Sequence, residues 1–213
     1  MENSKAYLYL IEQLDVNLKN GDDEIDIRAF EDLLPNEVGY IESRIVNSFK
    51  GKNGNYKWAK FMPLLHSYNG VDILKETLQV KPIPSEDSLY IAIVLLKVTG
   101  DVSYLKIIED NIHKANQEKE DYIYIIAHNK NDSLLHILEK VYINDEDEKL
   151  RSIAIEGILY NVGQINDIDD LAEFIEKRDY INSFILNDAY AREKCINELK
   201  LNIPKGLDRL ELG

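Results

Sequence analysis

Apolar residues recur every three or four positions along most of the chain, which is the spacing of one face of an α-helix. Near the start this pattern predicts an amphipathic helix over residues 4–19, ended by Gly21 in the manner of a C-terminal glycine. Two more helices are predicted over residues 23–34 and 36–49, the first of them ending before Pro35. The chain therefore begins as a series of helices.

Beyond residue 57 the helical pattern repeats. Turn signals about 30 residues apart occur at Asn69-Gly70, Thr99-Gly100, Asn131-Asp132 and Val162-Gly163. The apolar segments before these turns are Trp58–Ser67, Leu89–Val98, Tyr122–His128 and Leu150–Asn161. The segments after them are Asp72–Leu78, Val102–Ile112, Ser133–Tyr142 and Ile168–Ile175. Two helices in each period of about 30 residues predict a helical solenoid.

One of these periods resembles a HEAT repeat. In residues 147–163 an acidic turn precedes a helix. This helix has an apolar–Arg pair (Leu150-Arg151), a small residue (Ala154), an apolar pair (Ile158-Leu159) and a closing glycine (Gly163). The resemblance extends more loosely over residues 57–178, where the apolar–Arg pair is missing elsewhere and most repeats lack the usual proline. It implies an α-solenoid and a protein-binding surface, and rarely an enzyme.

The expected fold is all-α, an α-solenoid of HEAT-like helical hairpins with about 30 residues per repeat. We expect a single domain over residues 1–213. Within it, residues 1–50 would form an N-terminal helical cap, residues 51–180 the HEAT-like repeats, and residues 181–213 a C-terminal capping helix and tail.

Charge narrows the choice of partners. The 213 residues carry a formal net charge of −14. Residues 1–43 contribute −8, residues 44–71 contribute +5, and residues 72–213 contribute −11. Most of the surface should repel nucleic acids and anionic membranes and attract a basic protein partner.

Several features point to the cytoplasm. Cys195 is the single cysteine, so no disulfide can form within the chain. The first residues, Met-Glu-Asn-Ser-Lys, do not begin a signal peptide, and the longest uncharged apolar run, residues 88–96, is far short of the roughly 20 residues of a membrane helix. The abundance of Ile, Lys, Asn and Tyr fits an AT-rich bacterial genome.

Candidate chemistry is sparse, and we expect no catalytic residue, cofactor or metal. The four histidines, His66, His113, His128 and His136, have no zinc-ligand spacing and favour surface or packing roles. Cys195 is interpreted as a small buried apolar residue. The acidic clusters at residues 144–148 and 166–170 are interpreted as helix starts, and Asp101 and Asp132 as N-caps.

Residues 44–61 form a basic segment interleaved with aromatic residues. Its cations are Arg44, Lys50, Lys52, Lys57 and Lys60, and its aromatic residues are Phe49, Tyr56, Trp58 and Phe61. Such a mixture can hold single-stranded nucleic acid. The alternatives are that the aromatic residues belong to the core while the lysines solvate a loop, or that the loop docks on acidic neighbours.

These features favour a non-enzymatic, acidic protein-binding module. The specific hypothesis is an immunity protein that blocks the active site of a basic toxin, because small acidic HEAT-like chains resemble some bacterial immunity proteins. The candidate partner-binding residues are Tyr104, Glu109, Asp110, Glu139, Glu173 and Glu176. The alternatives are a nucleic-acid enzyme resembling the HEAT-like alkylpurine glycosylases and an acidic scaffold subunit.

Overall fold

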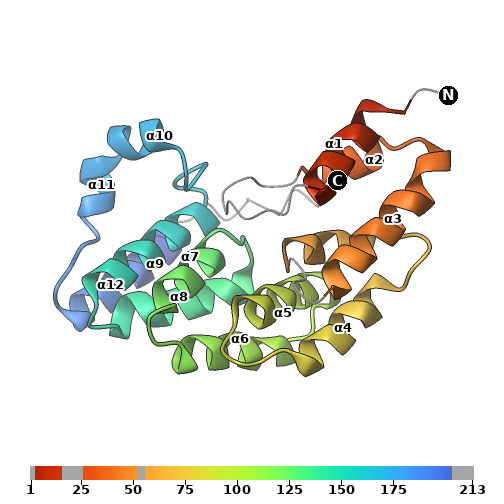
Figure 1. Ribbon diagram of the computed structural model, residues 1–213. Coiled ribbons are helices and arrows are strands. Elements are labelled where there is room, and N and C mark those ends of the chain that lie inside the picture. Colours follow the sequence, from red (N-terminus) through yellow and green to blue (C-terminus); the bar gives the residue numbers. More distant parts are fainter. Residues whose placement is uncertain (1–2, 16–25, 52–55, 203–213) are drawn as a thin grey trace. The chain divides into compact units, whose positions relative to one another are not determined.

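The computed structural model describes residues 3–15, 26–51 and 56–202, and this part of the chain contains helices and loops without a β-strand (Figure 1). The all-α prediction is confirmed. Among the described residues, no helix is long and apolar enough to cross a membrane. The chain divides into two compact units, Met1–Ala115 and Asn116–Gly213, which are described one at a time. The expected single domain with its caps and repeats stays a prediction.

Unit 1, Met1–Ala115, has six α-helices and one 3₁₀ helix among its described residues. Helix α1 packs on α2 and α3, the 3₁₀ helix η1 contacts α3, α4 and α5, and α5 packs along α6. The bounds are α1 Lys5–Asp15, α2 Arg28–Glu31, α3 Pro35–Lys50, η1 Tyr56–Leu64, α4 Gly70–Val80, α5 Glu86–Thr99 and α6 Ser103–Lys114.

Helix α5 is the centre of the unit 1 core. Its sequence is apolar on all sides, and eight of its residues are buried, as the solenoid prediction requires of an inner helix. Ser85 caps its start, and the buried Asn111 of α6 accepts hydrogen bonds from the Ser85 backbone N–H and the Ser88 hydroxyl, both at 2.8 Å. Gly100 ends α5 with a φ of 68°, so the turn predicted at Thr99-Gly100 is present.

Unit 2, Asn116–Gly213, contains six described helices. Helix α9 packs on both α7 and α8, and α12 packs on α8. Figure 1 shows α10 and α11 standing apart from these packed helices. The bounds are α7 Lys119–Ala127, α8 Asp132–Asn144, α9 Glu148–Asn161, α10 Leu171–Glu176, α11 Arg178–Asn182 and α12 Ala189–Asn202.

Two buried arginines of unit 2 hold the loops that precede their helices through hydrogen bonds to backbone carbonyls. Arg151 of α9 and Arg192 of α12 are each the fourth residue of their helix. Each donates through Nη1 to the backbone carbonyls five and six positions earlier, at 2.7 and 3.1 Å for Arg151 and at 2.9 Å for Arg192. Arg192 also donates to the carbonyl of Ile143 at the end of α8. The apolar–Arg pattern singled out Arg151 but not Arg192.

Three local predictions were wrong in detail. Of the helix predicted over residues 23–34, the described part is helical only in α2, and Leu34 is extended because it precedes Pro35. The segment Trp58–Ser67 contains a 3₁₀ helix, η1, with Pro63 inside it. The N-caps predicted at Asp101 and Asp132 are displaced by one residue, because Val102 is the N-cap of α6 and Asn131 is the N-cap of α8.

Other local predictions hold. Asp147 and Asp170 cap α9 and α10, which confirms that the two acidic clusters begin helices. Asp101 is not the N-cap of α6, but it lies one residue before that cap and accepts the Ser103 N–H at 2.9 Å. Tyr122 is helical, although its neighbourhood is rich in β-branched residues. The end of the first predicted helix, including Gly21, lies outside the described residues.

Candidate functional site

The six candidate partner-binding residues divide between the two units. Tyr104, Glu109 and Asp110 lie on α6 in unit 1 and are each partly buried. Glu139, Glu173 and Glu176 belong to unit 2, on α8 and α10. Each unit therefore offers its own candidate acidic surface.

Glu139 already serves the fold. Its residue is only 6% exposed. One carboxylate oxygen lies 2.6 Å from Lys200 Nζ of α12, and the other lies 3.2 Å from His136 Nδ1. This carboxylate links α12 to α8, so a substitution here would disturb packing as well as any binding. Its partner-binding role stays a prediction.

Glu173 holds the loop before its own helix. Its carboxylate accepts the backbone N–H groups of Asn166 and Asp167 and lies 2.6 Å from Lys177 Nζ. The hydrogen bond from Lys177 and those backbone N–H groups outweigh partial burial and lower the pKa of Glu173 to about 2. Glu176 differs from Glu139 and Glu173, because it is exposed and its side chain makes no hydrogen bond or ion pair with another described residue.

The surroundings of Glu176 combine acidity with exposed apolar side chains. Between Asn166 and Asp179 the chain has six carboxylates and two cations. Helix α10 contains no buried residue, and its Leu171 and Ile175 are 72% and 67% exposed. We call Asp170, Leu171, Ile175, Glu176 and Asp179 the α10 surface.

A polar cluster ties the loop before α10 to α7. Asp169 Oδ1 accepts the Tyr124 hydroxyl at 2.8 Å and lies 3.0 Å from His128 Nε2. His128 Nδ1 lies 2.8 Å from the Tyr124 carbonyl oxygen. Both ring nitrogens of His128 therefore lie against oxygen atoms of neighbouring residues. Burial opposes ionisation of Asp169, but the hydrogen bonds from His128 and Tyr124 keep its pKa below the ordinary value.

Glu156 lies on α9 near this cluster. Burial raises its pKa to about 7, and the nearby His128 opposes that rise. Both nitrogens of His128 are already engaged by oxygen atoms of the protein. No group of three or more possible metal ligands occurs among the described residues.

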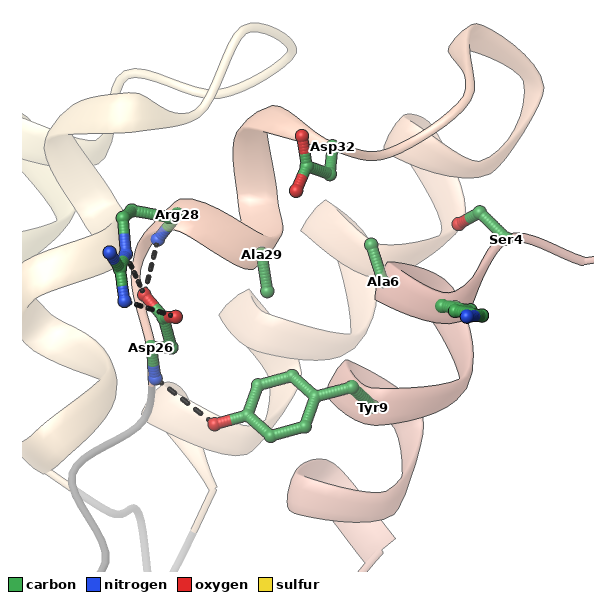
Figure 2. A pocket seen from close by; sticks show the side chains of 8 residues that line it. Ser4, Ala6, Tyr9, Asp26, Arg28, Ala29 and Asp32 are labelled. Atoms are coloured by element: carbon green, nitrogen blue, oxygen red, sulfur yellow. Dashed lines mark hydrogen bonds and ion pairs between the residues drawn. The ribbon is translucent and has the colours of Figure 1, made fainter.

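A groove of about 730 Å³ lies between α1 and α2 in unit 1 (Figure 2). On one side Asp26 binds Arg28 through both carboxylate oxygens at 3.0 Å, and the Asp26 backbone N–H donates to the Tyr9 hydroxyl. Because Asp26 and Arg28 neutralise each other, the groove presents no concentrated charge to a ligand. The remaining lining residues are Ser4, Lys5, Ala6, Ala29 and Asp32.

The basic segment at residues 44–61 is partly built into the core. Trp58 and Phe61 are 1% and 0% exposed, and Phe49 is also buried. Arg44 forms an ion pair with Asp15, whereas Lys52 lies outside the described residues. The buried rings confirm the interpretation that these aromatic residues pack in the core.

We compared the chain with protein-family models, curated proteins and solved structures, and none of them matches it. The resemblance to HEAT repeats and the function are therefore argued from the residues of this chain.

Proposed function

We propose that this protein is a non-enzymatic binding protein that uses an acidic helical surface to recognise a basic protein. The specific form of the proposal is a cytoplasmic immunity protein that covers the active site of a basic toxin. Binding would block the toxin by steric exclusion, and charge would steer the encounter. The proposed scaffold is an α-solenoid of HEAT-like hairpins.

Helix pairing supports the solenoid. Two pairs of consecutive long helices pack along each other, α5 with α6 and α8 with α9. The pattern Asp-x-x-x-Arg occurs at both Asp147 and Asp188, with an arginine in the same capping position each time. A hydrogen bond also spans 30 residues. The backbone N–H of Asn131, at one predicted turn, donates to the side-chain oxygen of Asn161 at the end of α9. The two capping arginines, 41 positions apart, repeat the same local structure, which is typical of stacked hairpins.

The observation that carries the binding proposal is the α10 surface. A concentration of carboxylates beside exposed apolar side chains is typical of a protein-binding surface, because apolar contact supplies affinity and charge supplies selectivity. Steric masking requires no catalytic group. The enzyme alternative gains no support, because three of the four aromatic residues that it needs for base stacking are buried: Phe49, Trp58 and Phe61.

The test is to capture partners from a lysate of the source cells with the tagged full chain, at about 50 mM and about 500 mM salt. Two concentrations are needed because salt screens and weakens contacts between charges. We expect one stoichiometric basic protein that is lost at high salt and inhibited by the chain. The variant Glu176→Lys should weaken capture, whereas Glu193→Lys, an equal charge change at an exposed position of α12, should not. Retention of nucleic acid in place of a protein would contradict the proposal.

A further inference from the structure

We propose that the α10 surface is the docking site for a cationic amphipathic helix of the partner protein. Leu171 and Ile175 are the apolar anchors, and Glu176 and Asp179 select for Lys or Arg beside them. This inference rests on the proposed function and adds the site and the chemistry of the partner.

The first argument is that α10 exposes apolar residues without needing them for its own fold. Helices in proteins gain most of their stability by burying an apolar face. No residue of α10 is fully buried, and its half-buried aromatic residue is Phe174 rather than Leu171 or Ile175. Polar contacts also hold it: Asp170 caps its start, and Lys177 Nζ donates to the Gln164 carbonyl at 2.7 Å. The side chains of Leu171 and Ile175 are therefore available to another molecule.

The second argument is the spacing of the anchors. Leu171 and Ile175 are four residues apart in one helix, so they lie on the same face about one helical turn apart. An amphipathic partner helix presents its apolar side chains at the same interval. Two anchors in register with two apolar residues of a partner helix would form a small apolar contact with charged edges.

The third argument concerns charge, which decides between possible occupants. Lys177 is engaged with Glu173, and Arg178 Nε lies 3.6 Å from Asp179 Oδ1. With six carboxylates and these two cations, residues 166–179 keep a net charge of −4. A second copy of this chain would bring like charges together at the same surface, and an anionic membrane would be repelled. A partner helix with Lys or Arg beside its apolar residues complements both the exposed apolar anchors and the carboxylates around them.

The test uses a synthetic amphipathic peptide of Leu and Lys, roughly 14 residues long so that it can form a helix. A matched peptide has Ser at each Leu position. The full-length chain should bind the first peptide and bind the second roughly tenfold more weakly, because the apolar anchors supply part of the affinity. Hydrogen exchange should slow at α10 when the first peptide binds.

Variants of the chain locate the site. The double variant Leu171→Ser, Ile175→Ser should bind the Leu/Lys peptide about tenfold more weakly, whereas Leu171→Met, Ile175→Met should retain binding. Tyr190→Ser, at a side chain 75% exposed on α12, serves as the matched control. Hydrogen exchange in the free variants shows whether α10 remains folded, and the Met variant separates loss of contact from loss of the helix.

Three outcomes would overturn the inference: no binding of the Leu/Lys peptide, equal binding of both peptides, or unchanged binding by the Ser variant. If the chain still captures a basic protein that does not require Leu171 and Ile175, the proposed function survives and only the site is wrong. If the chain captures no basic protein at either salt concentration, the proposed function itself fails.

Discussion

Gly157 provides the sharpest test of how the helices of unit 2 pack. It lies within α9 where this helix crosses α7. A β-carbon added at Gly157 would lie 2.6 Å from the β-carbon of Ala127 and 2.8 Å from its α-carbon. The nearest atoms include backbone, so a rotamer change cannot relieve the clash. We therefore expect Gly157→Ala to push the two helices apart.

Two opposing effects set the magnitude. Replacing glycine by alanine inside a helix favours folding by roughly 0.5–1 kcal/mol, because it reduces the freedom of the unfolded backbone. Overfilling a packed contact costs roughly 1–3 kcal/mol. Because the contact would be closer than β-carbons normally approach, the second effect should win. Gly157→Ala should lower the free energy of unfolding by about 1 kcal/mol.

Gly39 is a matched control. It lies inside α3, and an added β-carbon would meet nothing within 4 Å. Gly39→Ala should therefore stabilise the protein by roughly 0.5–1 kcal/mol. The same chemical change should have opposite signs at the two positions.

Urea unfolding followed by circular dichroism measures both variants. With a urea slope of about 1–2 kcal/mol/M, the two midpoints should differ by about 1 M. If the two units unfold separately, each substitution should shift the transition of its own unit. A Gly157→Ala variant as stable as the wild type would show that α7 and α9 are not in this close contact.

Three further predictions follow from single residues. Because the folded-state pKa of Glu156 is raised from 4.5 to about 7, its ionisation destabilises the fold as pH rises through that interval. Glu156→Gln should therefore raise the urea midpoint at pH 8 by the equivalent of about 2 kcal/mol but hardly change it at pH 4; equal effects at both pH values would refute this. Arg192→Met should cost about 2–4 kcal/mol, because it leaves three carbonyl oxygens without their donor, and unchanged exchange in α12 would contradict it. Cys195 is half-buried rather than fully buried, and this burial raises its pKa, so a thiol reagent should modify it more slowly in the native protein than in urea; similar rates would argue against that burial.

The positions of the helices and several of their ends were largely predictable from the sequence. Apolar spacing located the long helices, and the uniformly apolar sequence around Leu89 correctly indicated a helix buried on all sides. Gly100 was predictable as a helix end because it adopts a positive φ that glycine tolerates best. Asp147 and Asp170 were predictable as caps because their carboxylates bind N–H groups only two or three residues away.

The candidate site was less predictable, because carboxylates of the same type have different partners. Glu139 and Glu173 were candidates for partner contact, yet the fold engages Glu139 with Lys200 and Glu173 with Lys177. The contact between His128 and Asp169 joins residues 41 positions apart. No spacing rule within a helix identifies such a pair.

The sequence by itself determined the all-helical class, most helix positions, the acidic character and the caps at Asp147 and Asp170. These depend on composition and on interactions within a few residues. Tertiary structure decided which carboxylates stay exposed, that Arg192 shares the role of Arg151, and that Leu171 and Ile175 lie uncovered. These outcomes depend on contacts between distant segments. A helical pattern shows which residues share a face, but only packing decides whether that face is covered.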